Sequence, residues 1–180
     1  FQFIAAMNPC PCGFLGDPQG VCRCTPDKIQ RYRNRLSGPL LVRLDLHVEV
    51  PRVPVEMMRA NTQTIEASAA VAARVVEARN RQLSRQQVTN ARLNNREVER
   101  YCRPTAQGAM LLERAAIMLN LSARAYHRVL KVARTIADLA NVDTVDAGHI
   151  SEAMTLRRLD RGRMSGAPVA ANPIANRAEP

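Results

Sequence analysis

The sequence predicts an α/β segment followed by an all-α bundle, with the boundary near residue 53. Three observations support this fold class. Residues 3–7 form a short apolar run that stops at an Asn-Pro pair, as a buried strand does. Residues 44–50 alternate apolar and other side chains and are followed by Pro51, which is typical of a strand and its end. After Pro54, apolar residues recur at helical spacing for about a hundred residues.

One helix is expected between the two strands. Thr25 is a favourable N-cap, Pro26 suits the first helical position, and Asp27 favours the positive end of the helix dipole. The turn-forming residues Ser37, Gly38 and Pro39 should end this helix. The order over residues 1–53 is therefore strand, loop, helix, strand.

Five helices are expected over residues 54–160, each from a cap followed by an apolar stripe. Their caps include Ser68, the pair Asn94 and Glu97, and Ser122. The expected core-facing residues are Ala72, Val75, Val76, Arg79 and Leu83; Met110, Leu111, Ala115, Met118 and Leu119; Ala125, Val129, Val132, Ala133, Ile136 and Leu139; and Ile150, Ala153, Met154 and Leu156. Residues 161–180 are rich in Gly, Pro, Ala and Asn and are expected to form a disordered tail.

The charge is strongly positive. The chain has 26 Lys and Arg against 16 Asp and Glu, a formal net charge of +10. Such a balance favours polyanionic partners, either nucleic acid or nucleotide phosphates, although a solvated basic surface without a partner fits equally well.

No apolar run approaches a membrane span, and no signal peptide precedes the first motifs, so we expect a cytoplasmic protein without a membrane partner. Because residue 1 is not Met, we also expect the chain to be part of a longer protein.

Four of the five cysteines form two Cys-x-Cys pairs, Cys10 with Cys12 and Cys22 with Cys24. In a chain without a secretion signal, paired cysteines favour metal ligation over disulfides, and zinc prefers four thiolates in a tetrahedron. The sequence therefore predicts a structural Zn²⁺ site held by these four residues. A reduced, metal-free loop and disulfides are the alternatives. Cys102 is expected to be a buried thiol.

Several stretches together resemble a known family. They are "FQFIAAMNPCPCGFLGD", "CRC", "YRNRLSGPLLVRLDLHVEVP", "YCRP" and "LSARAYHRVLKVARTIADL", and they extend over nearly the whole chain to about residue 161. They are similar to the rear half of Mg-chelatase-like AAA+ ATPases of the bacterial competence-associated YifB/ComM type. The resemblance implies an α/β remnant of an AAA+ core with a four-cysteine loop over residues 1–53, a helical lid bundle over residues 54–160, and a tail over residues 161–180.

The resemblance also implies three nucleotide-response residues. Asn8 matches sensor 1, which orients water against the γ-phosphate; Arg43 matches the arginine finger, which reaches the nucleotide of a neighbouring subunit; Arg124 matches sensor 2 on the lid. The position before Arg43, usually Asp in the family, is Val42. Each residue also has a simpler explanation. Asn8 could merely end a strand, Arg43 could be a surface arginine paired with Asp45, and Arg124 could be an exposed arginine in the first turn of a helix.

The function implied by the resemblance is a ring-forming ATPase, expected to be a hexamer, that couples ATP and Mg²⁺ to DNA processing. The chain contains no G-x-x-x-x-G-K-[ST] motif, so by itself it is expected to be inactive as an ATPase. The alternative is a non-enzymatic, zinc-stabilised helical module that binds nucleic acid or a protein. Metal insertion into a tetrapyrrole follows from the family name alone, and no residue pattern selects it.

Overall fold

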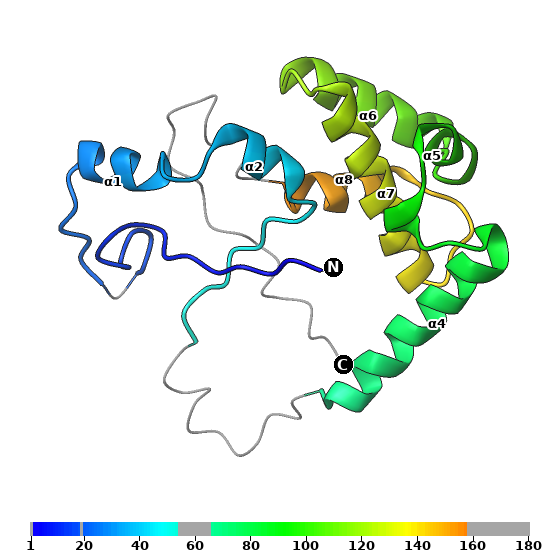
Figure 1. The fold of residues 1–180 in the computed structure, drawn as a ribbon, viewed down its shortest axis with the longest axis horizontal. Helices are drawn as coiled ribbons and strands as arrows, with labels where there is room; N and C mark the ends of the chain where they lie inside the picture. Colours follow the sequence, from blue (N-terminus) through cyan, green and yellow to red (C-terminus); the bar gives the residue numbers. More distant parts are fainter. Residues whose placement is uncertain (1, 19, 54–65, 158–180) are drawn as a thin grey trace. The chain divides into compact units, whose positions relative to one another are not determined.

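The computed structural model describes residues 2–18, 20–53 and 66–157. These residues divide into two compact units, which we treat separately (Figure 1). The N-terminal unit contains residues 2–44 and 49–53, and the helical unit contains residues 45–48 and 66–157. The expected tail lies outside the described residues, as does the start of the expected bundle at residues 54–65.

Among its described residues, the N-terminal unit contains two short helices, α1 (Pro26–Arg33) and α2 (Gly38–Arg43). The expected cap of α1 is confirmed, because the Thr25 side chain accepts a hydrogen bond from the backbone N–H of Lys28. The role expected for Ser37, Gly38 and Pro39 was wrong. Ser37 caps the start of α2, where Pro39 occupies one of the first helical positions, and α1 has already ended at Arg33.

Neither expected strand is present in the described part of the N-terminal region. Residues 3–7 and 44–50 pair with no neighbouring strand among the described residues, so the α/β part of the expected fold is not confirmed. The physical reason is that a strand is stabilised by hydrogen bonds to another strand and by burial of one face. Here Ile4 is 83% exposed and Val50 is 86% exposed. Among the residues that the structure describes, no sheet covers these apolar patterns.

The helical unit confirms that this part of the chain is all-α, as expected. It contains α4 (Ser68–Gln86), the 3-10 turn η1 (Asn90–Arg92), α5 (Asn95–Tyr101), α6 (Ala106–Met118), α7 (Ala123–Leu139) and α8 (Ala147–Thr155). The Asn94 and Glu97 capping box opens α5, and Ser122 caps α7, both as expected. The cap of α4 is Ala67, one residue before the expected Ser68, and it makes no side-chain hydrogen bond.

The core of the helical unit forms around α7. This helix packs against α4, η1, α5 and α8, and α6 packs against α8. Apolar residues from α5, α6, α7, α8 and the segments that join the helices fill the core, namely Leu93, Val98, Cys102, Leu112, Val129, Leu130, Ala133, Ala137, Val145, Ile150, Ala153 and Met154. The expected stripes of the last two helices are largely confirmed, with Leu139 as the exposed exception. Cys102 is buried, as expected.

The stripe expected on α4 was wrong, and the stripe expected on α6 is confirmed only for Ala115 and Leu119, which pack against the core. On α4, Val75 and Val76 are more than half exposed, and the buried residues are Ala78 and Gln82. On α6, Met118 is 82% exposed, while the buried positions are Gly108 and Leu112. Helical periodicity identifies an apolar face but not the partner that covers it. Within the described part of the chain, α7 contacts a polar side of α4 instead.

A buried carboxylate joins α4 to α7. The Asp138 side chain is fully buried and accepts hydrogen bonds from Arg85 Nη1 at 2.7 Å, from Arg134 Nε at 3.1 Å and from Asn90 Nδ2 at 2.8 Å. Gln82 of α4 completes the network by accepting from the backbone N–H of Asn90 at 3.0 Å. Burial by itself raises the pKa of Asp138. The hydrogen bonds from Arg85 and Asn90 and the nearby guanidinium charges outweigh burial and hold that pKa below its ordinary value.

We predict that Asp138→Asn lowers the free energy of unfolding of this chain by about 3 kcal/mol, because it leaves a buried guanidinium without its counter-charge. Since the pKa is lower in the folded than in the unfolded state, the carboxylate stabilises the fold above about pH 4, and this contribution fades as the pH falls further. Urea unfolding at several pH values measures both effects, with Arg74→Gln on the exposed part of α4 as the control. A difference from wild type that grows toward low pH contradicts the assignment.

Candidate functional site

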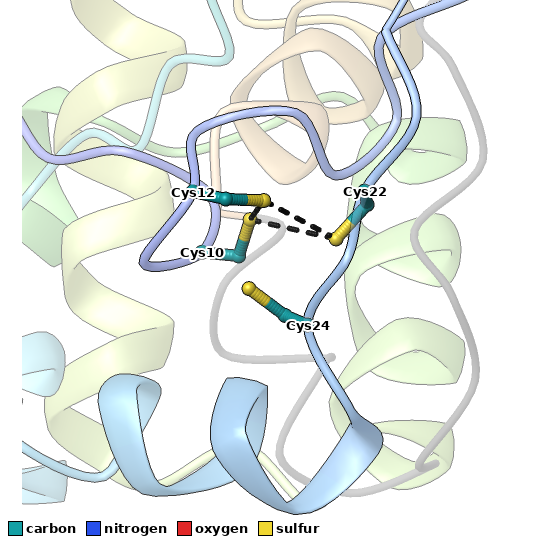
Figure 2. A group of neighbouring side chains, drawn as sticks. All are labelled: Cys10, Cys12, Cys22 and Cys24. Atoms are coloured by element: carbon teal, nitrogen blue, oxygen red, sulfur yellow. Dashed lines mark hydrogen bonds between the residues drawn. The ribbon is translucent and has the colours of Figure 1, made fainter.

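The four paired cysteines converge on one point. Figure 2 shows Cys10 and Cys12 on one loop, and Cys22 and Cys24 on the facing segment that leads into α1. Their sulfur atoms all lie within 4.8 Å of one another. All of the cysteines are free thiols, so the disulfide alternative is absent from the structure.

Tight turns bring the two pairs together. Gly13 and Gly16 have φ values of +82° and +83°, a region that other residues adopt at a cost, and the backbone N–H of Gly13 donates to the carbonyl of Cys10 at 3.0 Å. Farther along the loop, the Asp17 carboxylate pairs with Arg52 at 3.3 Å. The glycines that the sequence places between the cysteine pairs therefore fold the loop back on itself.

The sulfur separations fit a tetrahedral metal site. Cys10 Sγ lies 3.3 Å from Cys12 Sγ and 3.7 Å from Cys22 Sγ, and Cys12 Sγ lies 3.6 Å from Cys22 Sγ. Zinc bonds to sulfur at about 2.3 Å, which places tetrahedral thiolates about 3.8 Å apart. Four cysteine sulfurs are also the donor set that structural zinc prefers. The residues present therefore fit Zn²⁺.

The thiols compete for negative charge. Hydrogen bonds from the backbone N–H groups of Phe14 and Arg23 lower the pKa of Cys12 to about 6. A backbone hydrogen bond involving Cys24 also acts to lower the pKa of Cys22, but burial and the neighbouring sulfurs outweigh it and raise that pKa to about 11. The pKa of Cys24 is raised, chiefly by burial. The Cys12 thiolate thus forms more readily than those of Cys22 and Cys24, and a bound divalent cation would stabilise the thiolate form of all of its ligands.

The three residues expected to respond to nucleotide are all exposed. Asn8 follows the extended N-terminal residues, and its side chain lies beside Gly13 of the cysteine loop. Arg43 is the last residue of α2. Arg124 is the second residue of α7, in the turn capped by Ser122. Asn8 and Arg43 belong to the N-terminal unit and Arg124 to the helical unit.

Two interactions of charged residues were not predicted from the sequence. Asp45, considered as a partner for Arg43, instead accepts from Arg128 Nη1 at 2.6 Å within the helical unit. Sequence position favours a solvated Lys131, yet its Nζ donates to the backbone carbonyl of Leu93 at 2.6 Å. Charge alone gives no signal for such long-range partners.

The histidines also lack a shared site. His149 belongs to a capping box with Asp146 at the start of α8, and His47 is buried in the helical unit. The backbone N–H of His47 donates to the carbonyl of Leu156 at 2.6 Å. No helix among the described residues is both long and apolar enough to cross a membrane.

Comparison with known proteins covers both units. The family model described as magnesium chelatase, subunit ChlI C-terminal, matches residues 65–157, and the model described as magnesium chelatase, subunit ChlI, matches residues 1–58. The uncharacterized protein YifB of Escherichia coli (strain K12) is 45% identical over 161 residues, which are 89% of this chain and 31% of YifB.

Two further relatives have the same coverage pattern. Competence protein ComM of Haemophilus influenzae is 44% identical over 161 residues, 89% of this chain and 31% of ComM. An uncharacterized protein of Mycobacterium bovis is 34% identical over 162 residues, 88% of this chain and 31% of that protein. The chain thus spans about a third of the length of these relatives. Since the C-terminal family model alone covers more than half of the chain, the chain belongs to the magnesium chelatase ChlI family and is of the YifB and ComM type.

Proposed function

We propose that the protein containing this chain is a ring-forming ATPase that couples ATP binding and hydrolysis to DNA processing, with this chain supplying residues that respond to the nucleotide. The observation that carries the proposal is the position of two arginines. Arg43 and Arg124 occupy the exposed ends of two helices, at the sequence positions where this family is expected to have its arginine finger and sensor 2.

Arg43 fits the role of a finger because its guanidinium is presented at the end of a short, well-capped helix. A finger stabilises negative charge that develops on the transferred phosphoryl group in a neighbouring subunit. That role requires an exposed arginine, since its target lies on another polypeptide, and Arg43 is exposed. It also requires a ring or another assembly, and we propose a hexamer.

Arg124 fits the role of a sensor within the same subunit. It lies in the first turn of α7, beside the positive end of the helix dipole, where a cation is mildly unfavourable without an anionic partner. No carboxylate among the described residues pairs with it. A bound phosphate would supply the missing anionic partner and would offset the unfavourable position of the cation beside the helix dipole. The backbone N–H groups at the capped end of α7 would also attract the phosphate. Asn8 is proposed to orient the attacking water with its neutral amide.

ATP and Mg²⁺ are the cofactors that this proposal requires. The chain contains no phosphate-binding loop motif, so the groups that hold the triphosphate and Mg²⁺ must come from other residues of the intact protein. The contribution of Asn8, Arg43 and Arg124 is to sense the γ-phosphate and stabilise charge on it. The isolated chain is accordingly proposed to lack ATP turnover.

The cysteine cluster is proposed to hold one structural Zn²⁺. Four converging sulfurs at separations close to tetrahedral geometry support this metal. With four protein ligands the site has no open position for substrate, so the metal would stabilise the loop next to Asn8 and the start of α1.

DNA is proposed as the partner of the intact protein. The net charge of +10 favours a polyanion, and the scarcity of aromatic residues favours contacts with phosphates over stacking on bases. The second candidate, a non-enzymatic zinc module, is favoured by the same cysteine cluster and basic surface. The two differ in whether the intact protein hydrolyses ATP.

We predict that Arg43→Ala in the intact protein lowers kcat for ATP hydrolysis by about 10³-fold or more, because a finger acts on the transition state. Nucleotide affinity should change little. Steady-state turnover together with equilibrium binding of a fluorescent ATP analogue measures the two effects, and Arg114→Ala on the exposed side of α6 serves as the control. Weaker nucleotide binding with unchanged turnover of the bound nucleotide contradicts the role of Arg43.

We further predict about one zinc per chain in protein purified without chelators, since four thiolates complete a tetrahedral site. Cys22→Ser should reduce the zinc content strongly, whereas Cys102→Ser, which alters the buried thiol of the helical unit, should not. Elemental mass spectrometry and thiol titration under native conditions provide the measurement. Wild-type protein that holds no metal and has four freely reactive thiols rules out the site.

A further inference from the structure

We propose that the segment running from the second cysteine pair through α1 binds the phosphate backbone of DNA. We define the α1 basic face as Lys28, Arg31 and Arg35; Arg23 and Arg33 are further cations of the same segment. The inference rests on the proposed DNA partner and assigns it a surface.

The segment has a high density of positive charge. Between residues 21 and 37, five cations stand against the single carboxylate of Asp27, a net charge of +4 in a short segment. Zinc held by four thiolates carries a net charge of about −2, so bound metal offsets only part of this excess. The remaining positive field attracts an extended polyanion.

The side chains of these cations are accessible to a ligand. All five cations are exposed, and none of them forms an ion pair with a carboxylate in the part of the chain that the structure describes. The Nε group of Arg31 donates weakly to the backbone carbonyl of Asp27 at 3.4 Å, which leaves the rest of its guanidinium to solvent. Elsewhere in the protein, Arg85, Arg128 and Arg134 are all paired with aspartates.

Three of the cations lie along one side of a helical segment. Lys28, Arg31 and Arg35 follow one another at intervals of three and four residues, which places them along one side of a helical segment. The turn continues past Arg33, since the backbone N–H of Arg35 donates to the carbonyl of Tyr32. The adjoining side carries the half-buried residues Ile29, Tyr32 and Leu36. The cations and the apolar residues of this segment therefore lie on different sides.

The length of α1 favours nucleic acid over a single phosphate group as the ligand. Helix α1 has eight residues and is about 12 Å long. Phosphates along one DNA strand advance about 3.4 Å each, so the helix spans three or four of them. With Tyr32 half-buried, the face offers charge without a free aromatic platform, so binding through it should depend little on base sequence.

A metal held by the cysteine cluster would fix this helix in place. Cys22 and Cys24 flank Arg23, and Thr25 caps α1 directly after Cys24. Metal-bound sulfurs would hold Arg23 and the first turn of α1 as one rigid piece. Loss of metal should therefore weaken DNA binding through a loosened α1 while leaving its charges unchanged.

The test uses the intact protein with three substitutions, Lys28→Gln, Arg31→Gln and Arg35→Gln, which remove charge and keep good helix formers. A matched control carries Arg79→Gln, Arg96→Gln and Arg114→Gln, three exposed arginines of the helical unit. Fluorescence anisotropy with a labelled DNA duplex, and with one strand of it, gives Kd between about 50 and 200 mM salt. Circular dichroism and zinc content verify that each variant is folded.

We expect the α1 variant to bind at least tenfold more weakly at low salt, and the slope of log K against log salt on the duplex to fall by about 2 to 3. The control variant should retain most of its affinity and its slope. Equal losses in the two variants, or an unchanged slope in the α1 variant, overturn the inference. If wild-type protein binds neither probe, the proposed DNA partner itself fails, and ATP turnover in the same preparation shows whether the ATPase assignment stands.

Discussion

The helical unit depends on one buried carboxylate. Asp138 accepts hydrogen bonds from arginines on α4 and α7 and from Asn90 in the turn between α4 and α5, so α4 and the turn that follows it are fixed to a charge on α7, far away in the sequence. An unpaired charge in this place would be strongly unfavourable, which means that the segments must dock together or not at all. This constraint orients α7 within its unit, and α7 carries Arg124 at its capped, exposed end. The position of the proposed sensor thus follows from a structural network at the other end of the helix.

The N-terminal unit is organised by a different interaction, the convergence of four sulfurs. Two glycines with positive φ fold the loop, and Cys24 is followed at once by the cap of α1. A metal in this site would link Asn8, just before the first cysteine, to the basic helix just after the last one. In that arrangement, the proposed water-orienting amide and the proposed DNA-binding surface share one rigid support. A signal between nucleotide and DNA would then have a short physical route.

Local features of the fold followed from the sequence, and long-range ones did not. The caps at Thr25, Asn94 and Ser122 were predictable because a cap needs only a few neighbouring residues. The convergence of the cysteines was predictable from donor type and spacing. The strands were not, because a strand requires partners that the described residues do not supply. The apolar face of α4 was misplaced because Gln82 and Arg85 make a polar contact that periodicity treats as solvent-facing. The pairing of Asp45 with Arg128 joins residues 83 positions apart and leaves no local pattern.

The proposed action of Arg43 on ATP held by another subunit can be tested by mixing subunits. Intact protein carrying Arg43→Ala is mixed with intact protein whose phosphate-binding lysine is replaced, each inactive alone. We predict that mixed assemblies recover ATP turnover, because a wild-type Arg43 on one subunit then faces an intact nucleotide site on its neighbour. Mixed assemblies that form, as shown by differential labelling, yet recover no turnover would contradict it.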